Sequence, residues 1–126
     1  MPLMSLDPLQ IKAKNYVLKK GLDKKYDKWN KSKSWQKINH EYLVYSFSYK
    51  GEVYVGSSFN MGGRISVHRS RFKDALNGYY AYPVYKKLVE LGCKDLSEVE
   101  LNFHPNKHEY DLIEEIGTLN TQKYYE

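Results

Sequence analysis

The protein has 126 residues, a net charge of +5 and a single cysteine, Cys93. This length suits one compact domain with a short extension, and the lone cysteine excludes an intramolecular disulfide and a zinc site of several cysteines. Since the chain has neither an apolar run of membrane-spanning length nor a recognisable signal peptide, we expect a cytoplasmic protein that makes no membrane contact.

The positive charge is concentrated in the first third of the chain. Residues 1–40 contain ten lysines and three aspartates, a net charge of +7, whereas residues 41–126 contain ten basic and twelve acidic residues, a net charge of −2. Lysines that neutralise phosphates release condensed counterions, so the excess charge favours a nucleic acid as partner. A solvated basic helix that only keeps the protein soluble explains the charge equally well.

We predict a lysine-rich helical arm over residues 1–40. Asp7-Pro8 is a typical helix start, Gly21 marks a stop, and the apolar residues between them fall on one helical face. A second helical stretch is predicted from Asp23 toward Gln36, with lysines around an apolar face. The aromatic side chains of the arm either stack on bases or anchor the arm to the rest of the protein. They are Tyr16, Tyr26, Trp29 and Trp35.

Residues 41–126 are predicted to form the main domain. Aromatic and β-branched residues flank a turn at Lys50-Gly51, which is typical of a β-hairpin. From the hydrophobic spacing we expect strands over 42–47, 53–55 and 98–103, a loop over 56–63, and helices over 64–76, 82–91 and 109–116. This order predicts an α+β fold, in which helices flank a small, mainly antiparallel three-stranded sheet.

Short motifs in this domain occur in the order of a known family. Leu43-Val44-Tyr45 and Tyr54-Val55-Gly56 fall on the two strands of the hairpin, Ser57-Ser58 follow directly, and Arg64 precedes His68 by four residues. These motifs resemble the core of the GIY-YIG nucleases, although Leu43 replaces the first glycine and Val55 the middle isoleucine. The resemblance implies a stand-alone, metal-dependent endonuclease of the restriction or homing kind.

The end of the chain adds a carboxylate to this resemblance. Glu109, Ile113 and the segment Gly117-Thr118-Leu119-Asn120 resemble the family's last helix and tail. A single hard carboxylate and waters suffice to seat Mg²⁺, or Mn²⁺, against a scissile phosphate, so we expect Glu109 to be the metal ligand. As alternatives, Glu109 is only a helix-start carboxylate that favours the helix dipole, or Glu114 or Glu115 holds the metal.

Four further residues complete the expected catalytic set. The guanidinium of Arg64 is permanently charged and can bind two phosphoryl oxygens of the transition state. We expect Arg64 and a metal-bound phosphate to lower the pKa of Tyr45, which then takes a proton from the attacking water or only orients it. Tyr54 is expected to position the water at the metal or the scissile phosphate. His68 either shares proton transfer or hydrogen-bonds the phosphate, and the alternative is a buried histidine whose partners lie within the protein.

The remaining expectations concern support and binding. Asn120 and Gly56 are expected to support the site. Basic side chains are expected to contact the phosphates of DNA or, as the alternative, RNA; they are Lys12, Lys19, Lys20, Lys24, Lys50, Arg69 and Arg71. A chain with one site cuts one strand at a time, so cutting both strands requires a homodimer or two successive nicks. The competing hypothesis is a non-catalytic nucleic-acid-binding module that keeps the fold and binds through its basic arm.

Overall fold

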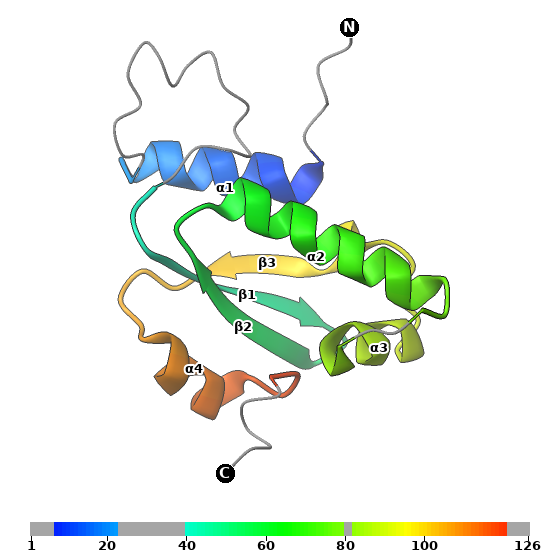
Figure 1. Ribbon diagram of the computed structural model, residues 1–126. Helices are drawn as coiled ribbons and strands as arrows, with labels where there is room; N and C mark the ends of the chain where they lie inside the picture. The colour runs from blue at the N-terminus through cyan, green and yellow to red at the C-terminus, as the bar shows by residue number, and fades with distance from the viewer. Residues whose placement is uncertain (1–6, 23–39, 80–81, 121–126) are drawn as a thin grey trace, which may run out of the picture.

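The computed structural model describes residues 7–22, 40–79 and 82–120 (Figure 1). In chain order they form α1 (Pro8–Lys19), β1 (Leu43–Tyr49), β2 (Glu52–Ser58), α2 (Met61–Leu76), α3 (Pro83–Glu90), the short 3-10 helix η3 (Leu96–Glu98), β3 (Glu100–Phe103) and α4 (Glu109–Ile116). The predicted α+β class and three-stranded antiparallel sheet are confirmed. The predicted helix over 23–36, and Lys24 within it, lie outside the described residues.

Strand β1 lies at the centre of the sheet, between β2 and β3, and both neighbours run antiparallel to it. Tyr45 on β1 is opposite Gly56 on β2 and Phe103 on β3. Lys50 and Gly51 connect β1 to β2 with φ angles of 49° and 84°, as in the two-residue turns whose twist matches that of the flanking strands. The predicted hairpin is confirmed, and its second strand is longer than predicted.

Helices cover both faces of the sheet (Figure 1). Side chains alternate along a strand, and Leu43, Tyr45 and Phe47 share the main core with residues of α1, α2 and α3. Val44 points to the opposite face, where it packs with Val55 against α4 in a smaller core. Strand β2 therefore contributes to both cores from the edge of the sheet. None of the described helices is both long and apolar enough to cross a membrane.

Helix α1 packs against α2 through its predicted apolar face. The buried apolar residues of α1 belong to the main core and are Leu9, Ala13 and Val17. Lys12 and Lys19 on its other side are exposed, as is Lys20 just after the helix. Gln10 is fully buried, and its Nε2 donates to the carbonyl of Gly62 and to Ser66 Oγ, both at 2.9 Å. Because a buried amide needs such partners, these hydrogen bonds hold the first turns of α1 and α2 together.

Helix α2 begins at Met61, so the prediction of a loop through Gly63 is wrong at its end. Two side chains serve the first N–H groups of the helix. Asn60 Oδ1 accepts from the Gly63 N–H at 3.0 Å, and His40 Nε2 accepts from the Met61 N–H at 2.8 Å. These bonds satisfy donors that no helical carbonyl can reach, which offsets the low helix propensity of glycine. Arg64 consequently lies near the start of α2.

Residues 118–120 cover the outer edge of β2. The Val53 N–H donates to Thr118 Oγ1 at 2.8 Å, and the Leu119 N–H donates to the Val53 carbonyl at 2.8 Å. Asn120 is fully buried, and its amide accepts from the Val55 N–H at 2.8 Å and donates to the Val55 carbonyl at 2.7 Å. Asn120 thus makes the hydrogen bonds that a neighbouring strand would make, and it fixes the backbone of β2.

Candidate active site

Tyr45 and Tyr54 lie on neighbouring strands and on one face of the sheet, in the core beneath α2. Their ring centroids are 6.4 Å apart, and Phe47 packs against both rings. Tyr45 is only 1% exposed, whereas Tyr54 is partly exposed. The structure therefore brings the two predicted tyrosines together, and Tyr54 is the one that reaches solvent.

His68 lies on α2 with its ring against the tyrosine pair, and it is buried. Its Nε2 is 2.6 Å from the Tyr45 hydroxyl, and its Nδ1 is 2.6 Å from the Tyr85 hydroxyl. Burial, and to a smaller extent the nearby charges of Arg64 and Arg71, lower the pKa of His68 to about 3. His68 is thus a neutral imidazole with both nitrogens bound within the protein, which matches the alternative stated for it.

Tyr85, on α3, is a site residue that sequence analysis missed. It is 3% exposed and reaches His68 across 17 positions of sequence. Burial raises the pKa of Tyr85 to about 12, against the opposing charge and hydrogen bond of Arg71. No motif marks Tyr85 among the 13 tyrosines of the chain; only the packing of α3 against α2 brings it to His68.

The two site tyrosines are both held in their neutral form. Burial raises the pKa of Tyr45 well above its usual range, Tyr54 adds to this, and Arg64 lowers it by less. The prediction that Arg64 lowers this pKa is right for that one interaction, but the net direction set by the protein's own groups is the opposite, because burial outweighs the guanidinium. The pKa of Tyr54 is also raised, first by burial and then by Glu109, while Arg64 lowers it.

Arg64 and Glu109 approach the tyrosine pair from different helices. Arg64 is exposed near the start of α2, and Glu109 is the partly buried first residue of α4. Ser57 Oγ on β2 donates to Glu109 Oε1 at 2.7 Å, so the carboxylate is tied to the edge strand. The charges of Arg64 and Glu109 act on Tyr45 and Tyr54 with opposite sign. A cation, a carboxylate and two phenols therefore share one site, and Ser57 is a further member, to which sequence analysis gave no role.

The carboxylate set around this site fits only a loosely held cation. In the part of the chain that the structure describes, no group of three or more His, Cys, Asp or Glu side chains could enclose a metal ion. Glu109 is fixed by Ser57 and partly open to solvent, which suits Mg²⁺ because that ion keeps most of its waters and binds through one or two carboxylates and substrate phosphate. Glu109 also occupies the first turn of α4, as the helix-dipole alternative requires.

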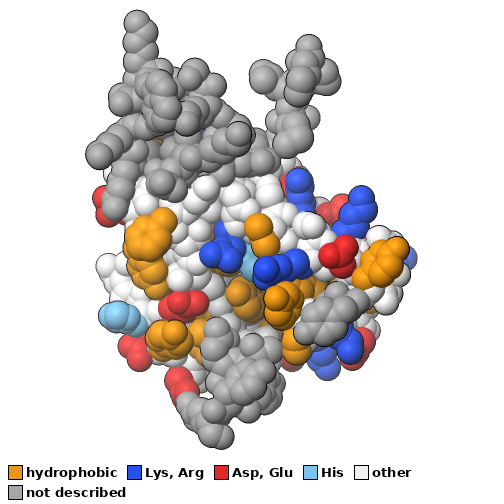
Figure 2. Space-filling model, in the orientation of Figure 1, with side chains coloured by type: hydrophobic (Ala, Val, Ile, Leu, Met, Phe, Trp, Pro, Cys, Tyr) orange, Lys and Arg blue, Asp and Glu red, His pale blue; other side chains and the backbone are white. Residues whose placement is uncertain are grey.

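Figure 2 shows the face of the molecule on which α2 and β2 meet. Lys and Arg side chains gather between these elements, hydrophobic side chains surround them, and acidic side chains lie beside them toward α4. Arg71 is seven residues after Arg64 and therefore lies on the same side of α2. Its guanidinium is 4.8 Å from the centroid of the Tyr82 ring. Both arginines lower the pKa of Tyr54, so both lie near the tyrosine site.

Two other predicted phosphate contacts are engaged within the protein. Arg69 forms an ion pair with Asp7, at the junction of α1 and α2. Lys50 Nζ donates to the Leu91 carbonyl at 2.8 Å, just after the C-terminal end of α3. The tyrosine site is thus flanked by Arg64 and Arg71, whereas Arg69 and Lys50 support the fold.

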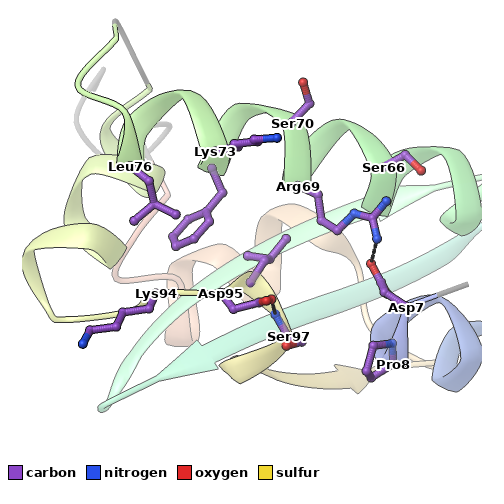
Figure 3. A pocket seen from close by; sticks show the side chains of 12 residues that line it. Asp7, Pro8, Ser66, Arg69, Ser70, Lys73, Leu76, Lys94, Asp95 and Ser97 are labelled. Atoms are coloured by element: carbon purple, nitrogen blue, oxygen red, sulfur yellow. Dashed lines mark hydrogen bonds and ion pairs between the residues drawn. The ribbon is translucent and has the colours of Figure 1, made fainter.

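A cavity of about 540 Å³ opens on the other side of α2 (Figure 3). It lies between the start of α1, the far side of α2 and residues 94–97, and Arg69 is the one predicted site residue in its wall. The side chains of Ser66, Arg69 and Lys73 come from the helical face opposite to that of Arg64 and His68. The cavity is therefore separate from the tyrosine site.

Gly56 leaves the space that the Tyr45 ring fills. A Cβ at this position would lie 2.5 Å from Tyr45 Oη and 2.6 Å from its Cζ. We expect Gly56→Ala to lower the free energy of unfolding by about 1–3 kcal/mol, because the buried ring must shift away from His68. Urea unfolding measures this change. Tyr45→Phe removes one of the clashing atoms, so the double variant should lose less stability than the two single variants added together; additive losses would contradict the clash.

Comparison of the chain with family models, with curated proteins and with solved structures found no match. The residues and geometry of the site are thus the basis on which its function is proposed.

Proposed function

We propose that this protein is a divalent-metal-dependent endonuclease that hydrolyses phosphodiester bonds in DNA. One observation supports this most: Ser57 ties the carboxylate of Glu109 to β2, the strand that carries Tyr54, and the charges of Glu109 and Arg64 act on both phenols with opposite sign. Cleavage of a phosphodiester needs a fixed positive charge for the phosphoryl oxygens, a hard ligand for a cation and polar groups that orient water. These three requirements correspond to Arg64, Glu109 and the hydroxyl of Tyr54.

In this proposal each residue of the chain has a separate task. Arg64 is exposed and can bind two oxygens of the scissile phosphate. Glu109, held by Ser57, would hold Mg²⁺ or Mn²⁺, which supplies charge neutralisation at the phosphate when bound. The water oxygen bonds to phosphorus as the bond to the leaving sugar oxygen breaks, and the proton lost by the water balances the one that the leaving oxygen gains. Tyr54 is partly exposed and orients the water, while the buried Tyr45 packs beside Tyr54 and holds it in place.

The basic side chains near the site indicate how a polyanion would lie on the protein. Arg71 is on the same side of α2 as Arg64 and beside the site, whereas Lys12 and Lys19 on α1 and Lys20 just after it are exposed further along the surface. Contacts of this kind add affinity without reading base sequence. RNA offers the same phosphates, and cutting both strands of a duplex needs two copies of the chain or two successive nicks.

A plasmid-nicking assay tests the proposal. Purified wild type is incubated with supercoiled DNA in Mg²⁺, in Mn²⁺ or in EDTA, and the double variant Arg64→Ala/Glu109→Ala from an identical purification is the control for contaminating nucleases. We expect nicking by the wild type with a metal ion, none in EDTA and none by the double variant. Nicking retained by the double variant would contradict the assigned site. A parallel reaction on labelled RNA compares the two nucleic acids.

A second candidate function has its own support. The pKa of His68 is held at about 3 and that of Tyr45 is raised, so neither group gains or loses a proton readily near neutral pH. This favours a non-catalytic module that binds nucleic acid through its basic side chains. Absence of nicking by the wild type with either metal ion, together with tight and salt-sensitive DNA binding, would support this function in place of the endonuclease.

A further inference from the structure

A hydrogen-bond chain runs through the core beneath the tyrosine site. The Tyr85 hydroxyl is 2.6 Å from His68 Nδ1, and the Tyr45 hydroxyl is 2.6 Å from His68 Nε2. The three side chains are 3%, 4% and 1% exposed, for Tyr85, His68 and Tyr45 respectively. Water therefore has little access to these groups, and each must satisfy its donors and acceptors within the protein.

Arg71 and Tyr54 lie at the two ends of this hydrogen-bond chain. Burial raises the pKa values of Tyr85 and Tyr54, and Arg71 and Tyr45, respectively, lower them as hydrogen-bond donors would. A guanidinium donates hydrogen bonds and cannot accept them, so the Tyr85 oxygen is the acceptor in its contact with Arg71. The hydroxyl proton of Tyr85 then remains to be donated, and His68 Nδ1 is at hydrogen-bond distance to accept it.

This direction determines the state of the imidazole. A neutral imidazole has one nitrogen that donates and one that accepts. If His68 Nδ1 accepts from Tyr85, the proton is on Nε2 and is donated to the Tyr45 oxygen. The Tyr45 oxygen is then an acceptor toward His68, and the hydroxyl proton of Tyr45 is free to point at the Tyr54 oxygen.

We propose that Tyr85, oriented by Arg71, fixes His68 in its Nε2–H tautomer and so directs the hydroxyl of Tyr45 toward the oxygen of Tyr54. Every hydrogen bond in the chain then runs the same way, from the exposed guanidinium of Arg71 to the partly exposed phenol of Tyr54. The last consequence, a Tyr54 oxygen aligned for the attacking water, rests on the proposed endonuclease function. Tyr85 touches no reacting atom in this scheme and is a positioning residue.

The tautomer is measured directly by long-range ¹⁵N–¹H NMR correlation of the histidine rings in the full chain, with His68→Gln used to assign the signals. We expect wild-type His68 as the Nε2–H tautomer. Tyr85→Phe removes the donor to Nδ1, so the pure Nε2–H signature should be lost. Tyr79→Phe, at an exposed position just after α2, is the matched control and should leave the signals unchanged. An Nδ1–H tautomer in the wild type, or an unchanged tautomer in Tyr85→Phe, would overturn the proposal.

Activity gives a second readout of the same positioning. In a folded Tyr85→Phe variant, verified by urea unfolding, we expect kcat for DNA nicking to fall by about 10-fold with KM unchanged, as for other groups that orient a site without touching substrate. An unchanged kcat would show that the hydrogen-bond chain does not position Tyr54. If the wild type does not cleave DNA but its His68 is the Nε2–H tautomer, the endonuclease function is wrong and the proposed hydrogen-bond chain is still supported. If the wild type cleaves DNA but its His68 is the Nδ1–H tautomer, only the proposed direction of the hydrogen-bond chain is wrong.

Discussion

Replacing Arg64 by alanine is expected to lower the rate of DNA nicking by about 10²- to 10³-fold, the loss typical when one preorganised group that binds transition-state charge is removed. Arg64 is exposed, so its loss leaves the core intact. Single-turnover nicking with protein in excess over plasmid measures the change without a contribution from product release. DNA affinity should fall little, with the dependence of log K on log salt reduced by about one phosphate contact.

Arg69→Ala is the matched control for Arg64→Ala. Arg69 is on the same helix, but it pairs with Asp7 on the side of α2 that faces the cavity. A partly exposed ion pair contributes about 1 kcal/mol or less to stability, and its removal does not touch the tyrosine site. We expect Arg69→Ala to nick DNA within a few-fold of the wild type. Equal losses in the two variants would mean that the positive charge of α2 acts on affinity alone.

The free energy of unfolding should decrease as the pH falls below about 6.5, because His68 resists protonation in the folded state. Its pKa in the fold is about 3, against an ordinary value of 6.5. Above pH 6.5 both folded and unfolded chains carry a neutral His68, and the stability is fully present. Between these two values only the unfolded chain takes up the proton, so stability is lost at up to about 1.4 kcal/mol per pH unit. The accumulated loss is on the order of 5 kcal/mol near pH 3.

Urea unfolding midpoints at several values between pH 7.5 and pH 4 measure this slope. His40, whose pKa is also lowered by burial, adds a loss in the same direction. His68→Gln removes the titrating ring and should flatten the curve, even if its stability at pH 7.5 is lower. His108→Gln, at an exposed position, should keep the wild-type slope. A wild-type slope in His68→Gln would show that other groups cause the acid loss.

The local elements of this fold are largely predictable from sequence, because short-range chemistry determines them. Aromatic and β-branched residues around Lys50-Gly51 specify the hairpin, and Asp7-Pro8 specifies the start of α1. The start of α2 was harder to place, because glycine spacing indicates a loop. His40 reaches Met61 from 21 residues away in the chain, and only the folded sheet brings this cap to the helix.

The residues of the candidate site likewise fall into those that the sequence predicts and those that only the fold brings together. Motif spacing indicates Tyr45, Tyr54 and Arg64, because they lie within one hairpin and the helix that follows it. Tyr85 carries no such signal, and the role of Ser57 could not be predicted although it follows the second motif. Their partners are 17 and 52 residues away, respectively, and depend on how α3 and α4 pack. The direction of the Tyr45 pKa shift could not be predicted from the sequence either, because it depends on how deeply the ring is buried.

The pairing of residues 118–120 with β2 bears on self-association. Val53 and Val55 direct backbone N–H and C=O groups to the rim of the sheet, where Thr118, Leu119 and Asn120 occupy them. An apolar strand with an open rim is a template on which another chain can add a strand, and this is a common route to aggregation. A chain shortened before residue 118 would expose that template. The three residues therefore block this rim and prevent a second copy of the sheet from adding a strand to β2.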